Sequence, residues 1–109
     1  MQLWEKWQEI RKKFPREEKY KLVDQLDRCI EGVSSTIVEG SSKRSFRECA
    51  RYIDISKGSL MESRNHFTFS YKKGYISQPE KNDLDALIEK LYFKEIGFQK
   101  WLDTQDMKK

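Results

Sequence analysis

Apolar residues recur at intervals of three and four along almost the whole chain, and this spacing constrains the fold more than any other feature of the sequence. No segment alternates polar and apolar residues with the period of two that a strand requires. Short connections make consecutive helices antiparallel neighbours. We therefore predict an all-α chain, one antiparallel up-down-up-down four-helix bundle domain over 1–109 with a short first helix. The helices are expected at about 2–13, 16–39, 46–73 and 78–103.

Helix-breaking and helix-capping residues mark the boundaries of these segments. Pro15 suits the first turn of the second helix, where its missing N–H costs no hydrogen bond. Gly40 and Gly74 are expected to end the second and third helices, since a left-handed residue commonly follows a helix. Residues 45–48 and 77–80 each read Ser-x-x-Glu, the pattern of a capping box.

The third segment alternates large and small residues along its seam. The seam consists of Phe46, Cys49, Ile53, Ser56, Leu60, Ser63, Phe67 and Ser70. Small side chains would let a neighbouring helix approach closely, and the alternative is a polar edge that faces water. On the fourth segment, Glu95 occupies a seam position between Leu91 and Phe98.

Composition excludes several classes of protein. The 109 residues hold 22 Lys and Arg against 18 Asp and Glu, a net charge of +4, and 13% are aromatic, which favours a packed core. No apolar run is long enough to span a membrane, and the first residues lack the apolar stretch of a signal peptide. With only two cysteines, the sequence predicts a reducing, cytoplasmic location and no membrane partner.

Catalytic and metal-binding patterns are missing. Di-iron sites in four-helix bundles use paired Glu-x-x-His motifs, whereas the single histidine, His66, follows Glu62 by four residues. No glycine-rich phosphate loop and no nucleophile–base set can be assembled from the spacing. We expect no enzyme activity, no metal site and no cofactor.

The expected hairpin of the second and third helices leads to two predictions about which residues lie close together. A turn near Ser42 places position 62 close to Gln25, so a buried Glu62–Gln25 hydrogen bond is expected. The same turn offsets Cys29 from Cys49 by about 9 Å along the helix axis. A disulfide is therefore excluded, and both cysteines are expected to act as small core residues.

Three stretches of the chain match a known pattern: Phe14-Pro15, Ile37-Val38-Glu39-Gly40 and Ile55-Ser56-Lys57-Gly58-Ser59-Leu60-Met61-Glu62. Over about Phe14 to Leu102 the sequence resembles the small bacterial four-helix-bundle proteins encoded by rRNA intervening sequences. Accessory proteins of diversity-generating retroelements share that fold. The resemblance implies a helical bundle, a homopentamer, association with nucleic acid and no established enzyme activity. It also makes a reverse transcriptase a candidate partner.

Positive charge is concentrated in the third segment. Residues 43–73 hold eight Lys and Arg against three Asp and Glu. Arginine suits bidentate contacts with phosphate, so this basic stripe is a candidate nucleic-acid interface. Its members are Lys43, Arg44, Arg47, Arg51, Lys57 and Arg64. The alternative is a solvated helix face that nearby carboxylates neutralise, with Glu39 pairing with Lys43 or Arg44.

Tryptophans and helix length point to self-association. Trp7 lies on the seam of the first helix, whereas Trp4 and Trp101 lie off the seams and are candidates for an oligomer contact. The first helix is shorter than the others and leaves about 18 Å of the bundle groove uncovered.

Two functions remain open at this stage. The first is a non-enzymatic oligomer that binds the RNA or DNA backbone in a salt-dependent way, in rRNA-linked biology or as an accessory subunit of a reverse transcriptase. The second is an oligomeric scaffold, a protein-interaction ring without direct nucleic-acid contact.

Overall fold

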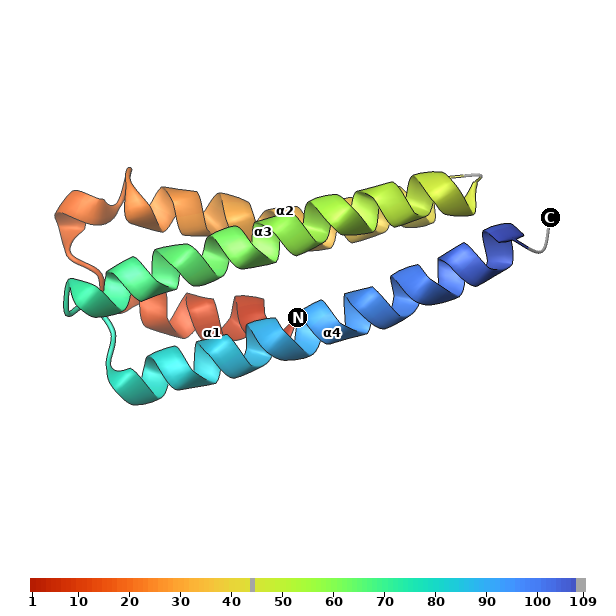
Figure 1. The fold of residues 1–109 in the computed structure, drawn as a ribbon. Coiled ribbons are helices and arrows are strands. Elements are labelled where there is room, and N and C mark those ends of the chain that lie inside the picture. Colours follow the sequence, from red (N-terminus) through yellow and green to blue (C-terminus); the bar gives the residue numbers. More distant parts are fainter. Residues whose placement is uncertain (44, 108–109) are drawn as a thin grey trace.

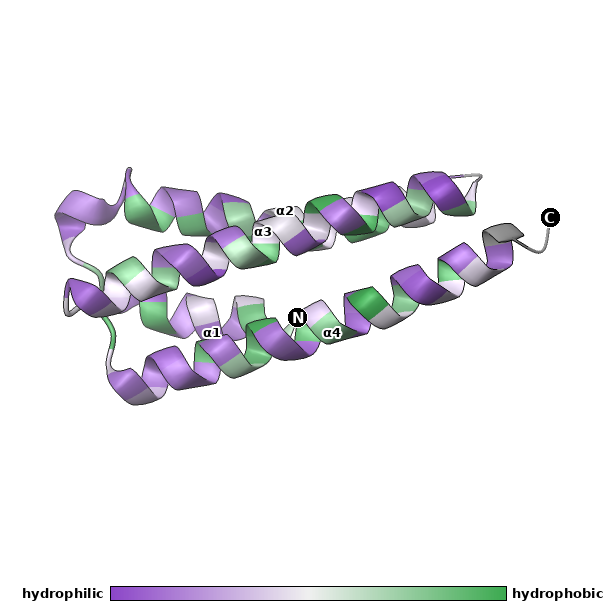
Figure 2. Cartoon of the chain, viewed as in Figure 1, coloured by the Kyte–Doolittle hydropathy of each residue, from purple (hydrophilic) through white to green (hydrophobic). Residues whose placement is uncertain are grey.

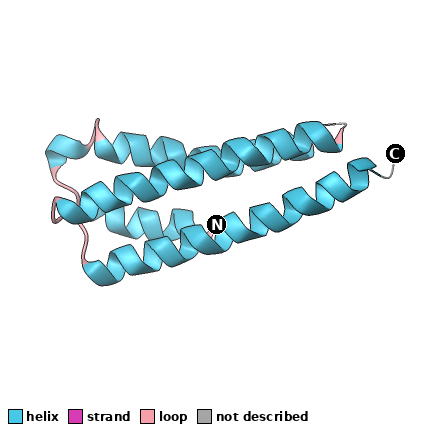
Figure 3. Ribbon diagram, in the orientation of Figure 1, coloured by secondary structure: helices cyan, strands magenta, loops and turns pink. Residues whose placement is uncertain are grey.

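The computed structural model describes residues 1–43 and 45–107, and this part of the chain forms four α-helices and two short 3₁₀ turns (Figure 1). In chain order they are α1 (Gln2–Ile10), η1 (Arg11–Lys13), η2 (Arg16–Glu18), α2 (Leu22–Ser41), α3 (Phe46–Lys72) and α4 (Gln78–Met107). Each helix runs antiparallel to the next, and only short loops connect them (Figure 3). This confirms the all-α, up-down-up-down bundle with a short first helix. None of the described helices is both long and apolar enough to cross a membrane.

The short α1 packs at one end of an elongated molecule that measures 52 × 24 × 18 Å. Trp7 of α1 is completely buried there, and its ring meets Phe14 and Phe67 edge-on at centroid distances of 5.3 and 5.6 Å. The indole Nε1 donates a hydrogen bond of 2.7 Å to Asp27 Oδ1, and Arg11 pairs with the other oxygen of the same carboxylate. The main hydrophobic core is therefore concentrated where all four helices are present.

The opposite end of the bundle holds a smaller core cluster. Its buried members are Cys49, Ala50, Ile53 and Leu102, with Phe46 packed against them. These residues come from α3 and α4, and α1 does not extend to this end (Figure 1). Hydrophobic bands alternate with hydrophilic ones along the helices throughout (Figure 2). The less extensive part of the core thus lies at the end of the bundle that α1 does not reach.

Two of the predicted boundaries of α2 are wrong. Pro15 has an extended backbone (ψ 153°) and precedes the turn η2, so the α-helix begins only at Leu22. Gly40 lies inside α2, and its φ angle is negative. Among the glycines of the described chain, Gly74 (φ 80°) is the one with a positive φ. A Cβ on Gly40 would come within 2.8 Å of Tyr52 Cβ. Gly40 is therefore required by the close approach of α3 and does not end the helix, whereas the predicted stop at Gly74 is confirmed.

The second predicted capping box is present in full, and the first is present as a serine cap. The Ser45 hydroxyl accepts a hydrogen bond of 3.0 Å from the Glu48 backbone N–H at the start of α3. At the start of α4, the Ser77 hydroxyl accepts from the Glu80 N–H at 3.2 Å, and the Glu80 carboxylate accepts from the Ser77 N–H at 2.8 Å. These local contacts fix where the two longest helices begin.

The register of the α2–α3 hairpin differs from the prediction by about two helical turns. Gly32 lies beside Ser59, and Gly40 lies beside Tyr52, so facing positions are symmetric about residues 45 and 46. The prediction placed the turn near Ser42 because it assumed that Gly40 ends the helix. Since α2 continues to Ser41, the turn comes later and every facing pair shifts.

The seam of α3 faces the interior, and the alternative of a polar edge in water is wrong. Ser56, Ser63 and Ser70 are all 0% exposed. The Ser63 and Ser70 hydroxyls donate to backbone carbonyls one turn back, at 2.9 and 2.8 Å. The Ser56 hydroxyl donates instead to Glu95 Oε1 at 2.6 Å. Each of these buried hydroxyls therefore has an acceptor, as burial requires.

The seam of α4 contains the expected exception. Glu95 is only 6% exposed, so a carboxylate occupies a core position. Its second oxygen, Oε2, has no hydrogen-bond partner among the described residues. Burial raises the pKa of Glu95, while the Ser56 hydrogen bond and the Lys57 ammonium act in the opposite direction. Phe98, predicted on the same seam, is 44% exposed and does not belong to the core.

Candidate nucleic-acid interface

Two arginines of the predicted basic stripe lie exposed on the first half of α3. Arg47 and Arg51 are one helical turn apart, so their side chains share a face. Arg51 has no ion-pair partner among the described residues. Arg44, which was predicted to extend this face, lies outside the described residues.

Three further cations of the basic stripe pair with carboxylates of the chain, namely Lys43, Lys57 and Arg64. Lys43 lies 4.0 Å from the Glu39 carboxylate, as predicted, and its ammonium is 5.0 Å from the centre of the Tyr52 ring. Arg64 of α3 lies 3.8 Å from the Asp85 carboxylate of α4. These contacts lower the charge that the stripe offers to an external anion.

Lys57 is the most strongly engaged of these cations. Its ammonium lies 3.3 Å from Asp54 Oδ1 and donates to Gln99 Oε1 at 2.7 Å. The Gln99 amide donates in turn to Asp54 at 2.7 Å and to the Ala50 carbonyl at 3.0 Å. The Gln99 hydrogen bond, followed by Lys57, lowers the pKa of Asp54 below its ordinary value. Lys57 therefore joins α3 to α4, which is a structural role.

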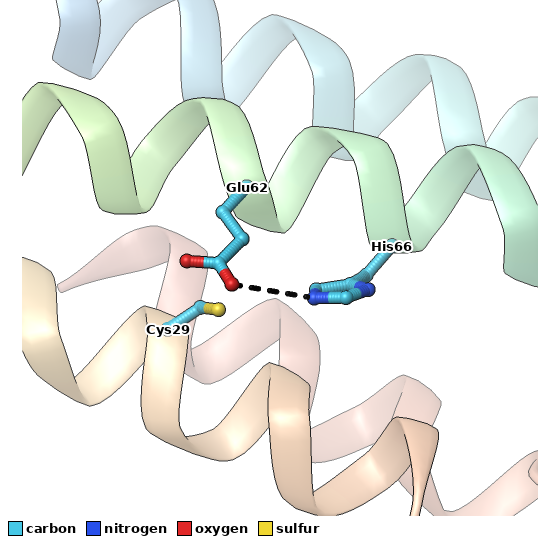
Figure 4. Close-up of side chains that lie close together, drawn as sticks. All are labelled: Cys29, Glu62 and His66. Atoms are coloured by element: carbon cyan, nitrogen blue, oxygen red, sulfur yellow. Dashed lines mark ion pairs between the residues drawn. The ribbon is translucent and has the colours of Figure 1, made fainter.

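The predicted Glu62–Gln25 hydrogen bond is wrong. Gln25 is exposed, and the shifted hairpin register places Glu62 opposite Cys29. Glu62 Oε1 also lies 3.8 Å from Nε2 of His66 on the next turn of α3 (Figure 4). Burial, followed by the Glu62 carboxylate, raises the pKa of the Cys29 thiol to about 11. Cys29 and Cys49 are both buried and unbridged, as expected.

A second basic surface was missed by the sequence analysis. It surrounds the α1–α2 corner, at the opposite end of the bundle from Arg47 and Arg51 (Figure 1). Arg11, Lys12, Arg16 and Lys19 line a pocket of about 230 Å³ whose apolar wall is Phe14, Pro15 and Val23. The signal was present in the sequence, since residues 11–21 hold six Lys and Arg against two Glu. The apolar periodicity of this segment indicates only a helix boundary.

The two tryptophans predicted at an oligomer contact differ in exposure. Trp4 is half-buried and packs against the main core. Trp101 is 50% exposed and lies beside Phe46 of the smaller core cluster. Its ring stacks on Phe98 at 5.9 Å with an interplanar angle of 13°, and it meets Phe46 edge-on at 6.1 Å. Two exposed aromatic rings, Phe98 and Trp101, therefore lie beside the smaller core cluster.

These features define a class: an antiparallel four-helix bundle with a short first helix and exposed cations at both ends. The family model described as 23S rRNA-intervening sequence protein matches residues 1–94. The chain therefore belongs to this family, in agreement with the resemblance found in the sequence. A search of curated proteins finds no match.

Proposed function

We propose that this protein is a cytoplasmic, non-catalytic homo-oligomer that binds the phosphate backbone of structured RNA in an rRNA-linked process. The observation that carries the proposal is the exposure of Arg47 and Arg51 on one face of α3, where Arg51 has no ion-pair partner among the described residues. Membership of the 23S rRNA-intervening sequence family supports RNA as the ligand.

The chemistry of the two arginines fits a backbone ligand. A guanidinium group donates two parallel hydrogen bonds to a phosphate and remains charged at every physiological pH. Two such groups one turn apart lie about 5–6 Å from each other at Cβ, so both can contact one strand. Contacts of this kind position the nucleic acid without reading its sequence, and binding should weaken steeply with salt.

The test measures binding of a structured RNA at several salt concentrations. Arg47→Ala/Arg51→Ala should flatten the plot of log affinity against log salt by about 0.7–0.9 per lost phosphate contact. Lys90→Ala/Lys94→Ala is the matched control, because it removes two exposed cations at the same spacing from α4. Equal slopes for the two variants would contradict the assignment to α3.

The second basic surface, at the α1–α2 corner, is tested by a third variant in the same binding experiment. Lys12→Ala/Arg16→Ala removes two exposed cations that line the pocket at the α1–α2 corner. If this variant alone flattened the salt dependence, RNA would bind at the other end of the bundle and the assignment to Arg47 and Arg51 would be wrong. If the wild-type protein bound no RNA at low salt, the whole proposal would fail.

Self-association is proposed at the end of the bundle that α1 leaves uncovered. Trp101 and Phe98 expose a stacked aromatic pair there, and aromatic rings are enriched in interfaces. The family resemblance favours five subunits. Light scattering should give a mass several times 13.2 kDa, and Trp101→Ala should shift the protein toward the monomer. A wild-type monomer at micromolar concentration would contradict this proposal.

The alternative, a protein-interaction ring, is favoured by one specific observation. Three of the predicted basic residues, Lys43, Lys57 and Arg64, already pair with carboxylates of their own chain. A scaffold of this kind would self-associate without binding RNA at any salt concentration. An adjacent reverse transcriptase gene, together with co-purification of that enzyme, would identify the accessory-subunit form of this function.

A further inference from the structure

Cys29, Glu62 and His66 bring three different ligating groups together at the α2–α3 interface (Figure 4). The thiol comes from α2, and the carboxylate and imidazole come from successive turns of α3. Their ligand atoms all lie within 4.8 Å of one another. Among the described residues, this is the one group of three or more His, Cys, Asp or Glu side chains with that geometry.

The separations are close to those that zinc requires. Zinc binds sulfur at about 2.3 Å and nitrogen or oxygen at about 2.0–2.2 Å, so the ligand atoms of a tetrahedral site lie roughly 3.3–3.8 Å apart. Glu62 Oε1 and His66 Nε2 are already 3.8 Å apart. The Glu62 side chain is 62% exposed, so its carboxylate has room to adjust to an ion held between Cys29 and His66.

Charge and burial also suit a divalent cation. A thiolate and a carboxylate together neutralise the two positive charges of the ion, and a neutral imidazole completes the set. Cys29 is 8% exposed, and the His66 side chain is 16% exposed, so the two act as an inner wall while Glu62 faces solvent. Lys73, the cation that lines the neighbouring groove together with His66, already pairs with Glu18 at 3.7 Å.

We propose that Cys29, Glu62 and His66 form a zinc site that joins α2 to α3 and leaves one coordination position to water. No metal site was predicted from the sequence, because Glu62 and His66 are four residues apart and form no Glu-x-x-His pair. The wrong hairpin register then placed Gln25, and not Cys29, opposite Glu62. The site is independent of the proposed RNA contacts on the first half of α3.

The test titrates Co²⁺, as a spectroscopic substitute for Zn²⁺, into chelator-treated protein. Wild-type protein should develop a thiolate-to-cobalt charge-transfer band, and added Zn²⁺ should abolish it by displacement. Cys29→Ser should show no such band. Cys49→Ser is the matched control, because Cys49 is also 8% exposed but lies outside the group, and it should behave as wild type.

His66→Ala and Glu62→Gln test the other two ligands, and each should weaken cobalt binding by about tenfold or more. Circular dichroism of every variant checks that the bundle still folds. A second readout is thermal: Zn²⁺ should raise the melting temperature of wild-type and Cys49→Ser protein but not of Cys29→Ser. The absence of a charge-transfer band in folded wild-type protein, or its persistence in Cys29→Ser, would overturn the proposal.

Discussion

The hydrogen bond between Ser56 and Glu95 allows a sharp prediction about stability. Ser56→Ala removes the one donor to a carboxylate that is 6% exposed and whose second oxygen already lacks a partner in the described chain. Leaving a charged acceptor buried and unpaired costs about 1–3 kcal/mol. For a domain of this size, the melting temperature should fall by about 4 °C or more.

Removing both partners should have the opposite effect. In Ser56→Ala/Glu95→Leu no polar group remains to be satisfied, and a buried leucine side chain contributes about 1.5–3 kcal/mol relative to an exposed one. Replacing a buried charge network by apolar side chains of similar size is often stabilising by about 1–4 kcal/mol. The double variant should therefore be more stable than wild type, although it contains the destabilising Ser56→Ala change.

The pH dependence follows from the raised pKa of Glu95, which burial causes. Because the folded protein holds this proton more tightly than the unfolded chain, the contribution of Glu95 is fully present below its ordinary pKa of about 4.3. That contribution is lost as the pH rises through the higher pKa of the folded state. The penalty of Ser56→Ala should thus be smaller near pH 4 than at pH 7, and the double variant should lose this pH dependence.

Urea unfolding followed by circular dichroism, at one protein concentration and several pH values, measures these effects. The decisive result is whether Ser56→Ala/Glu95→Leu is more or less stable than the wild-type protein. If Ser56→Ala and Ser56→Ala/Glu95→Leu destabilised the protein equally at pH 7, the carboxylate would not be an unfavourable buried charge. The reasoning would then be refuted.

Two further predictions follow from the packing. Gly40→Ala should destabilise the protein by about 1 kcal/mol or more through overpacking, whereas Gly58→Ala, whose Cβ meets nothing within 4 Å, should stabilise it by about 0.5–1 kcal/mol in the same urea assay. Asp27→Ala leaves the buried Trp7 indole without its acceptor and should lower the free energy of unfolding by about 1–3 kcal/mol. Its control, Asp24→Ala, removes an exposed ion pair and should change stability by less than about 1 kcal/mol.

Structural features that depend only on residues close together in the sequence could be predicted, and the helix ends illustrate this. The Ser45 cap, the capping box beginning at Ser77 and the left-handed Gly74 all act within four residues, so their sequence pattern specifies the structure. Gly40 illustrates the limit. A glycine near a predicted helix end suggests a left-handed stop, but here its small size accommodates Tyr52 from another helix.

The residues of the candidate interface show the same distinction between features set by local sequence and features set by tertiary packing. The exposure of Arg47 and Arg51 follows from their helical position, which the sequence specifies. The internal pairing of Lys57 and Arg64 does not, because their partners Asp54, Gln99 and Asp85 include residues of α4 whose position depends on packing. A count of charges along the chain therefore overestimated the positive charge available on the basic stripe.

The sequence by itself determined four amphipathic helices and their antiparallel order, because hydrophobic periodicity and capping are local properties. Burial of the α3 seam, which the pattern left open, was decided by packing. Only the tertiary structure decided the register of α2 against α3, since a shift of about two turns preserves the same amphipathic faces. That register places Cys29, and not Gln25, beside Glu62 and His66. The proposed zinc site thus depends on the register of α2 against α3, which local sequence patterns do not specify.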